Sequence, residues 1–400
     1  MMVRASGYRW TLNQYATGVE GNRTRIFTGR RQDVQRLPSF TGKEFKEDKR
    51  TEATGSEEVS IPLYPLYPCE PCRIDSRLMK ILVTGGAGFI GSHVVSALLS
   101  EGHVVTVIDD FNDFYDPGIK RANVASFSLP VEVAEIDLRE WDEVHRLFDR
   151  VKPDAVIHLA ARAGVRPSIL DPKLYIDTNI TGTLHILEAA RLSGCSKLLF
   201  ASSSSVYGLS KTVPFREDLP LLQTLSPYAA TKLAGEQLCG NYVNLHGMRI
   251  ACLRFFTVYG PGQRPDLAIH SFTDSIEHGR PIRQFGDGST RRDYTYVDDI
   301  VQGVLGALSF VEGDGPLFEI FNLGENETTT LAKLISSIEK ALGKTAIIER
   351  LPEQKGDMPL TAADITKART LLGYAPKTPI REGIPKFVAW YRNLAGKLPE

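Results

Sequence analysis

Gly85-Gly86-Ala87-Gly88-Phe89-Ile90-Gly91 follows directly after the apolar run Ile81-Leu82-Val83-Thr84 and opens a helix-like run. A glycine-rich turn between a strand and a helix lets free backbone N–H groups and the positive end of the helix approach a pyrophosphate. The helix-like run carries an apolar stripe and stops at Gly102, as a helix that packs on a sheet does. The stretch therefore predicts a dinucleotide-binding turn formed by Gly85, Gly88 and Gly91.

A second buried-looking run, Val104-Val105-Thr106-Val107-Ile108, ends on Asp109. An acidic residue at the end of the second strand, about 20 residues past the last glycine, is where such a fold grips the ribose 2′-hydroxyl. The same carboxylate repels a 2′-phosphate. We therefore predict NAD rather than NADP as the cofactor, with Asp109 at its adenine ribose.

The second decisive motif is Tyr228-Ala229-Ala230-Thr231-Lys232. Its spacing places a phenol and an ammonium on one face of a helix, about one turn apart. A free phenol has a pKa near 10, and a neighbouring ammonium together with a nicotinamide cation can lower that pKa toward neutrality. We predict that Tyr228 is a general base, and that Lys232 lowers its pKa and holds the cofactor ribose.

Composition narrows the class of protein further. The chain has 400 residues, 42% of them hydrophobic, and a formal net charge of −1. It can bury a large core, and it has no charge bias toward nucleic acid or membrane surfaces. No apolar run approaches the length of a membrane span. We therefore expect neither a nucleic-acid partner nor a membrane partner.

The cysteines indicate a reducing compartment. There are five of them, an odd and scattered set, which argues against a disulfide framework and favours a cytoplasmic location. Cys69 and Cys72 have the spacing of half a zinc site, but no second Cys/His pair follows at the spacing of a zinc finger. We predict no metal site.

Strand-like and helix-like runs alternate from Met79 onward. The strand-like runs are 80–84, 104–108, 155–159, 197–201, 250–255 and 318–323, and the helix-like runs include 140–150, 174–193 and 227–246. This alternation predicts an α/β fold with a Rossmann-like, doubly wound parallel sheet. After Phe256, loops rich in glycine and proline and short helices predict a smaller, discontinuous C-terminal domain over the carboxyl ends of the strands.

Three segments of the chain follow from this pattern. Residues 1–78 are polar and show neither sustained periodicity nor an apolar signal-peptide core, so we expect a disordered N-terminal extension, or a start codon assigned too far upstream. A tail that docks on a partner stays open as an alternative. The NAD-binding domain is expected at 79–255, with 294–324 returning to it, and the C-terminal domain at 256–293 and 325–400.

Taken together, the motifs resemble the extended short-chain dehydrogenase/reductase family over essentially all of residues 79–395. The resemblance rests on Thr84 with the glycine turn, Asp137-Leu138, His158-Leu159-Ala160-Ala161, Asn179, Ser202 to Gly208, the Tyr-x-x-x-Lys motif, Leu253 to Phe256, and Arg292-Asp293-Tyr294. Within that family the chain looks most like the NAD-dependent nucleotide-sugar 4-epimerases. This resemblance implies a homodimer that pairs through the helices at 174–193 and 227–246.

The resemblance also implies roles for individual residues. Ser203, Tyr228 and Lys232 would be catalytic. The cofactor would be lined by Phe89, Ile90, Asp137, Leu138, Leu159, Ala160, Ala161, Asn179 and Phe255. Arg292 and Asp357 would hold the UDP of a nucleotide-sugar substrate. Asn179 is equally readable as a polar residue inside a helix that bonds to backbone groups.

The sugar is indicated by finer matches. Dehydratases and decarboxylases of this family carry acids where this chain has Ser204 and Ser205, which cannot do their acid–base work, so epimerisation is favoured. Several stretches look like UDP-glucuronate 4-epimerases, among them 111–120, 163–166, 256–261 and 354–357. A carboxylate would then be received by Ser204, Ser205 and Thr257, with Arg166 or Arg264 nearby.

Two departures keep other substrates open. The loop from Gln284 to Thr290 is more similar to that of UDP-glucose or UDP-N-acetylhexosamine 4-epimerases, and Arg162 stands where a glutamine is expected. Epimerisation of those sugars is the main alternative. A decarboxylase or dehydratase of UDP-sugars, or a non-catalytic dinucleotide-binding protein, is less favoured.

Overall fold

The computed structural model describes residues 78–221, 223–325, 327–352 and 360–395. The chain divides into two units, Met1–Arg73 and Ile74–Glu400, and all described residues belong to the second. Apart from Leu78, the expected N-terminal extension lies outside the described residues, and so do Cys69 and Cys72.

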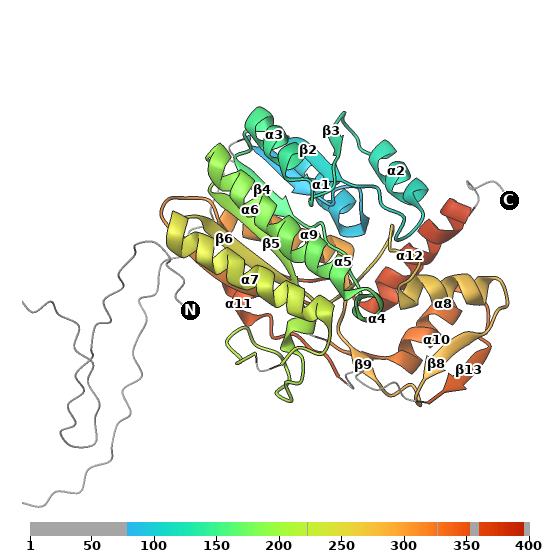
Figure 1. The fold of residues 1–400 in the computed structure, drawn as a ribbon. Helices are drawn as coiled ribbons and strands as arrows, with labels where there is room; N and C mark the ends of the chain where they lie inside the picture. The colour runs from blue at the N-terminus through green and yellow to red at the C-terminus, as the bar shows by residue number, and fades with distance from the viewer. Residues whose placement is uncertain (1–77, 222, 326, 353–359, 396–400) are drawn as a thin grey trace, which may run out of the picture. The chain divides into compact units, whose positions relative to one another are not determined.

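A parallel sheet of seven strands forms the centre of the described unit (Figure 1), in the order β11-β6-β5-β4-β1-β2-β3. Neighbouring strands that are not consecutive in the chain require crossover helices, as in a doubly wound fold. The order reverses between β1 and β4, which leaves a crevice at the carboxyl ends of these strands. The strands are β1 (Lys80–Thr84), β2 (Val104–Asp109), β3 (Glu132–Glu135), β4 (Ala155–His158), β5 (Lys197–Ser203), β6 (Arg249–Phe255) and β11 (Leu317–Leu323).

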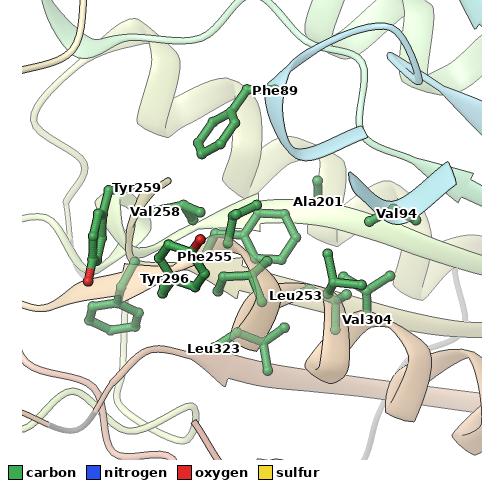
Figure 2. Packing of buried hydrophobic residues seen from close by; sticks show 14 of the residues in the cluster. Phe89, Val94, Ala201, Leu253, Phe255, Val258, Tyr259, Tyr296, Val304 and Leu323 are labelled. Atoms are coloured by element: carbon green, nitrogen blue, oxygen red, sulfur yellow. The ribbon is translucent and has the colours of Figure 1, made fainter. Parts of the chain in front are cut away.

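Alternate strand residues supply two separate cores, because successive side chains of a strand point to opposite faces. Leu82, Ile108 and Val156 pack on one face with α3 (Trp141–Val151), α6 (Gly182–Ser193) and α7 (Pro227–His246). Figure 1 shows these three helices side by side across the sheet. On the other face lie α1 (Phe89–Ser100) and α9 (Val297–Phe310). There, Leu253, Val304 and Leu323 form part of one cluster (Figure 2).

The remaining elements connect the layers or build the C-terminal part. Between the sheet strands lie α2 (Pro117–Ala125), α4 (Val165–Leu170) and α5 (Pro172–Ile176), and α11 (Thr366–Leu372) packs near β11. The C-terminal part contains α8 (Ala268–Glu277), α10 (Leu331–Leu342) and α12 (Ile380–Ala395). Its strands pair as β7 (Thr257–Tyr259) with β10 (Tyr294–Tyr296), β8 (Ile282–Phe285) with β13 (Ile348–Leu351), and β9 (Arg291–Arg292) with β12 (Thr329–Thr330).

The structure corrects the predicted elements in three places. The helix expected over 174–193 is divided, because a π-helical turn at Asp177–Thr181 separates α5 from α6. β3 is absent from the predicted strand-like runs, since its sequence Glu-Val-Ala-Glu is short and half polar. The C-terminal helices are not short: α8, α9, α10 and α12 have 10 to 16 residues and bury apolar residues at helical spacing.

Candidate functional site

One pocket lies at the carboxyl ends of the strands, where the strand order reverses. The glycine turn after β1 forms one side of it. Residues at or just after the ends of β2, β3, β4, β5 and β6, residues of α7 and the segment from β7 onward form most of the rest. Figure 2 shows Phe89 of α1 on one side, with Phe255 and Val258 across from it. Of the predicted residues, the lining includes Gly85, Gly88, Phe89, Ile90, Gly91, Asp109, Asp137, Leu138, Leu159, Ala160, Ala161, Ser203, Tyr228, Lys232, Phe255, Thr257 and Arg264.

The glycine turn is closed too tightly for any side chain. A Cβ on Gly91 would lie 2.0 Å from the carbonyl oxygen of Gly85, and a Cβ on Gly85 would lie 2.8 Å from the backbone nitrogen of Ala160. Gly85 also has a φ of 71°, in the left-handed region that favours glycine. The bare turn ends at the N-terminus of α1, where backbone N–H groups and the helix dipole favour an anion. The turn therefore fits a dinucleotide pyrophosphate.

Asp109 reaches the pocket as a member of a buried ion pair. Its Oδ1 accepts a hydrogen bond from Nζ of Lys120 at 2.8 Å and one from the backbone nitrogen of Phe111 at 3.0 Å. Lys120 also lies 3.5 Å from Asp110. Lys120 therefore already balances part of the charge of the carboxylate that is predicted to contact the ribose. The sequence pattern does not predict this lysine.

The far end of the pocket is marked by Asp137 and Leu138. Burial opposes ionisation of Asp137, but hydrogen bonds from Arg139 outweigh it and lower the pKa of the Asp137 carboxyl. Leu138 is buried, and its backbone oxygen lies 2.8 Å from Nδ1 of His185. The apolar and polar walls at this end are compatible with the cofactor-lining position that the resemblance implies for Asp137 and Leu138.

Ser203, Tyr228 and Lys232 come together from two elements. Ser203 is the last residue of β5, while α7 is capped by Ser226, whose side chain accepts a hydrogen bond from the backbone nitrogen of Ala229 at 3.2 Å. This N-cap places Tyr228 in the first turn of α7 and Lys232 one turn later. The phenol of Tyr228 is hydrogen-bonded to Ser203, and Nζ of Lys232 donates to the carbonyl oxygen of Ala201 at 2.7 Å.

The protein's own atoms do not lower the pKa of Tyr228. Burial raises it, and the hydrogen bond from Ser203 and the positive charge of Arg264 only oppose that effect. Burial also lowers the pKa of Lys232, to about 8. The prediction assigned the lowering to Lys232 together with the nicotinamide cation; among the protein groups alone, desolvation is the larger effect.

Arg264 brings a guanidinium from the C-terminal part to the same pocket. It donates two hydrogen bonds to Asp266, at 2.9 and 2.8 Å, and stacks 5.2 Å from the ring centre of Phe114. Thr257, at the start of β7, lines the pocket beside it and is held by a 3.2 Å bond from its backbone nitrogen to the carbonyl oxygen of Asp293. The pocket that contains Tyr228 thus also has a fixed cation and a hydroxyl.

Asn179 lies behind the pocket wall rather than in its lining. Its side chain accepts from the backbone nitrogen of Arg162 at 2.8 Å and donates to the backbone oxygen of Arg162 at 2.9 Å. It also donates to the hydroxyl of Thr231 at 3.0 Å. These contacts match the alternative interpretation of Asn179 as a structural residue that bonds backbone groups.

Four other predicted residues lie away from the lining. Arg166 stacks 5.3 Å from the ring centre of Phe285, and Arg292 lies in β9, with a bond of 3.0 Å to the carbonyl oxygen of Arg291. Ser205 donates to Ser203 at 2.9 Å, next to Ser204 in a short 3₁₀ turn. Direct ligand contacts for these residues stay predictions. Asp357 lies outside the described residues.

Several lining residues were missed by the sequence analysis. The segment after β2 contributes Asn112, Phe114, Tyr115 and Lys120. The signal was available, because residues just past the carboxyl end of a strand next to the crevice are expected at a ligand. Arg162 also lines the pocket, and its Nη1 donates to Oδ1 of Asn112 at 3.1 Å.

Among the described residues, no group of three or more His, Cys, Asp or Glu side chains is arranged to hold a metal ion. Within the same ranges, no helix is both long enough and apolar enough to cross a bilayer.

Comparison with known proteins places these features in a family. A model of the NAD dependent epimerase/dehydratase family matches residues 81–324. A UDP-glucuronate 4-epimerase of Thermodesulfobacterium geofontis (strain OPF15) is 44% identical over 316 residues, which cover 78% of this chain and 96% of that protein. UDP-glucuronate 4-epimerase 1 of Arabidopsis thaliana is 42% identical, with 80% of this chain and 78% of that protein covered.

Solved structures are similar as well. The crystal structure of UDP-glucuronic acid 4-epimerase from Bacillus cereus, in complex with UDP-glucuronic acid and NAD, matches with a TM-score of 0.74 and 39% identity. The match covers 79% of this chain and all of that one. The UDP-glucose 4-epimerase of Thermus thermophilus, in complex with NAD, matches with a TM-score of 0.71 and 33% identity, and the match covers 78% of this chain and 99% of that one.

Proposed function

This chain belongs to the NAD dependent epimerase/dehydratase family, and we propose that it inverts carbon 4 of a UDP-sugar through a 4-keto intermediate, with UDP-glucuronate as substrate and UDP-galacturonate as product. The observation that carries the proposal is one pocket that joins the glycine turn to Ser203, Tyr228, Lys232 and Thr257. Relatives named UDP-glucuronate 4-epimerase support the choice of sugar.

The two parts of the chain bind different ligands. Residues 79–255, with 294–324, hold NAD, while 256–293 and 325–400 hold the nucleotide sugar, where Arg292 and Asp357 bind the UDP. Bound NAD would supply the hydride acceptor for carbon 4 and the hydride for its opposite face, so that no net oxidation would occur. All other steps fall to the side chains of the pocket.

Tyr228 takes the proton from the 4-hydroxyl as carbon 4 is oxidised, and returns it when the ketone is reduced. Ser203 is hydrogen-bonded to this phenol and relays a hydrogen bond to the same sugar oxygen. Because burial raises the pKa of Tyr228 in the protein, the positive charges of Lys232, Arg264 and the nicotinamide have to offset desolvation. Positioned acid–base groups of this kind contribute about 100- to 10,000-fold to a rate.

The substrate carboxylate is placed by Thr257 and Arg264. Both line the pocket near Tyr228, whereas Arg166, the other arginine considered, stacks on Phe285. Arg264 keeps its guanidinium between Asp266 and the ring of Phe114, which fixes its orientation for a charge-assisted hydrogen bond. Ser204 and Ser205 complete the hydroxyl cluster next to Ser203.

Epimerisation of a neutral UDP-hexose is the second candidate. Two observations favour it: the loop from Gln284 to Thr290 resembles that of UDP-glucose 4-epimerases, and the Thermus thermophilus enzyme shares the fold at 33% identity. The relatives named UDP-glucuronate 4-epimerase are more similar to this chain, at 44% and 42% identity. We therefore rank this candidate second.

One panel of assays tests the proposal. The purified protein is incubated, without added NAD, separately with UDP-glucuronate, UDP-glucose and UDP-N-acetylglucosamine, and the products are resolved by chromatography. We expect UDP-galacturonate from UDP-glucuronate and little turnover of the other two. Interconversion of UDP-glucose and UDP-galactose alone would make the sugar assignment wrong, and release of a UDP-pentose as the main product would identify a decarboxylase. Inactivity toward all three sugars would contradict the whole proposal.

We also propose that the protein is a homodimer that pairs through α6 and α7. Leucines on these helices are exposed in the single chain: Leu184 and Leu192 on α6, and Leu245 on α7. An exposed apolar helix face of this kind favours burial against a second copy. Light scattering after size exclusion tests it. We expect the mass of two chains for the wild type and of one chain for Leu184→Glu with Leu192→Glu, whereas a wild-type monomer would contradict the proposal.

A reducing, cytoplasmic compartment completes the proposal. The described part of the chain contains three cysteines, Cys195, Cys239 and Cys252, and all three are buried free thiols. Burial raises the pKa of Cys195 to about 11, so this thiol resists ionisation and oxidation. Mass spectrometry with and without reductant tests it, since a disulfide among these residues in the native protein would contradict it.

A further inference from the structure

An ion pair with no assigned role lies beneath the candidate site. Glu236 is 1% exposed and Arg254 is 2% exposed. Nε of Arg254 donates to Oε1 of Glu236 at 2.9 Å, and Nη2 donates to Oε2 at 2.8 Å. The hydroxyl of Ser202 donates to the same Oε1 at 2.5 Å. The Glu236 carboxylate therefore accepts three hydrogen bonds inside the core.

The pair joins the three elements that carry or flank the candidate catalytic residues. Tyr228, Lys232 and Glu236 follow one another at intervals of four residues along α7, so they share a helix face. Ser202 and Arg254 are register partners on β5 and β6. Lys232 contacts Ala201 and Glu236 contacts Ser202, so α7 is bonded to the two residues that immediately precede Ser203.

We propose that Glu236 and Arg254 are positioning residues for the catalytic group: they hold α7 in register with β5, and together they keep the net charge next to Lys232 near zero. The proposal rests on the proposed epimerase function, because it assigns Tyr228 and Lys232 their roles in that reaction. It adds two residues that touch neither sugar nor cofactor.

Stability alone gives no reason for this ion pair. Replacing a buried, hydrogen-bonded ion pair by apolar residues of similar volume is often neutral or stabilising, whereas removing one partner is costly. The Arg254 guanidinium also lies 4.8 Å from the ring centre of Tyr207, so each end of the pair is built into the core. A charged pair next to a catalytic lysine does, however, set the electrostatic balance there.

The charge of Glu236 acts on Lys232. Burial lowers the pKa of Lys232 to about 8, and Cys239 and the Glu236 carboxylate both oppose that effect. The Arg254 guanidinium, held by the same carboxylate, acts in the other direction on nearby groups. The titratable and charged groups around Lys232 are Tyr228, Glu236 and Cys239 of α7, His158 of β4, and Arg254 of β6.

The two halves of the pair therefore have opposite effects on pH dependence. Glu236→Gln removes an anion and leaves the Arg254 cation, which disfavours the ammonium of Lys232 and favours the phenolate of Tyr228. Both pKa values fall, so the pH profile of kcat moves to lower pH, by about 1 pH unit for a charge this close. Arg254→Met leaves the anion, so the profile moves to higher pH. The double variant restores the wild-type position.

The test measures kcat and KM for UDP-glucuronate against pH for the wild type, both single variants and the double variant. We expect kcat to fall by about tenfold or more in the single variants with KM changed by less than about threefold, because misplacement acts on the reacting groups. Glu132→Gln is the matched control: Glu132 is exposed and paired with Arg150 on the rim of the sheet, and its profile should stay at the wild-type position.

Melting temperature and bound NAD are measured on every variant. If a single variant fails to fold, the inference is tested by the double variant, whose pH profile should lie at the wild-type position, and by Ser202→Ala. Ser202→Ala removes only a hydroxyl from the Glu236 carboxylate, and we expect a lower kcat with an unchanged profile. If the pH profiles of kcat of the two folded single variants shift in the same direction, or do not shift, the inference is wrong. A wild type that is inactive toward all three UDP-sugars instead contradicts the proposed function.

Discussion

The ammonium of Lys232 donates a hydrogen bond to the backbone carbonyl oxygen of Ala201, 2.7 Å away, and so ties helix α7 to the end of strand β5. Ala201 lies two residues before Ser203 on that strand, and Tyr228 lies one turn before Lys232 on the helix. The bond therefore holds the helix that carries Tyr228 against the strand that ends at Ser203. Ser203, Tyr228 and Lys232 occupy separate positions on these two elements, so each side chain can be substituted and tested by itself.

The first prediction concerns Tyr228→Phe. The ring of Tyr228 packs edge-on against Tyr175 at 6.3 Å, and phenylalanine keeps that contact, so the fold and bound NAD should be unchanged. Turnover of the UDP-sugar should fall by about a hundredfold or more, the usual contribution of a positioned acid–base group. Tyr242→Phe makes the same chemical change on the same helix, away from the pocket, and should keep turnover within about twofold. Near wild-type turnover in Tyr228→Phe means that Tyr228 is not the base.

The second prediction concerns the glycine turn. Gly91→Ala places a methyl group 2.0 Å from the carbonyl oxygen of Gly85, so the turn has to open. Overpacking of this kind costs about 1–3 kcal/mol, which, taken from the binding free energy, corresponds to a loss of about 5- to 150-fold in NAD affinity. Bound NAD is measured after purification, and its affinity by titration.

Gly194→Ala is the control for that variant. Gly194 has a φ of 82°, and no atom lies within 4 Å of a Cβ built on it. Alanine there costs only backbone strain of about 1–2 kcal/mol, so the melting temperature should fall while NAD stays bound. Equal NAD binding by Gly91→Ala and the wild type would show that the turn does not hold the cofactor.

The sequence predicts elements well where the determinants are local. Helix α7 runs over Pro227–His246, the range predicted, because Ser226 caps its start and Gly247, at a φ of 68°, ends it. The glycine turn and the Tyr-x-x-x-Lys spacing are equally local, and both reach the pocket. Short-range sequence patterns are therefore sufficient to predict these features.

What the sequence does not predict depends on residues that meet only in the folded chain. The π-helical turn at Asp177–Thr181 places Asn179 on the backbone of Arg162, 17 residues earlier, and nothing in the local pattern marks it. Lys120, on α2, pairs with Asp109 at the end of β2 and partly balances its charge. Desolvation of Tyr228 likewise follows from packing rather than from the spacing of the motif. Hydrogen-bond partners, burial and charge balance depend on these tertiary contacts, so the local sequence does not predict them.

The third prediction concerns the pH dependence of stability. Burial and the charges of Asp299, Asp293 and Glu327 raise the pKa of Glu325 to about 8, and its Oε2 lacks a hydrogen-bond partner in the described part of the chain. Between the unfolded pKa, near 4.5, and the folded value, the native state holds a proton that the unfolded state has lost. The free energy of unfolding therefore falls as pH rises through this window.

Glu325→Gln should remove that slope. The variant should melt about 2 °C or more above the wild type at pH 8.5, where the wild type carries a buried charge, and close to it at pH 4.5. Glu349→Gln, an exposed acid of β13, is the control and should change neither value. The raised pKa of Glu325 would be contradicted if the wild type became more stable between pH 5 and 8 and Glu325→Gln removed that increase.

The fourth prediction follows from the chemistry of the proposed substrate. Oxidation of carbon 4 of a glucuronate makes a β-keto acid, which loses carbon dioxide when the bond between carbon 5 and the carboxyl carbon lies perpendicular to the carbonyl plane. The electron pair of that bond then forms an enolate, which takes a proton at carbon 5 to give a 4-keto-pentose. Return of the hydride first removed from carbon 4 would reduce this ketone to a UDP-pentose. An epimerase must prevent this, and we propose that Thr257 and Arg264 do so by holding the carboxylate in the carbonyl plane.

Thr257→Ala should therefore weaken epimerisation of UDP-glucuronate and raise the fraction of UDP-pentose. A hydrogen bond to a charged group is worth about 1.5–3 kcal/mol, so the pentose fraction should rise by about tenfold or more. Thr257→Val removes the hydroxyl at constant volume and should behave alike, while Thr257→Ser keeps the hydroxyl and should give the wild-type ratio. Mass spectrometry of the products decides it. Epimer alone from the alanine and valine variants, with no pentose above the wild-type level, would mean that Thr257 does not restrain the carboxylate, because the freed group would otherwise rotate and decarboxylate.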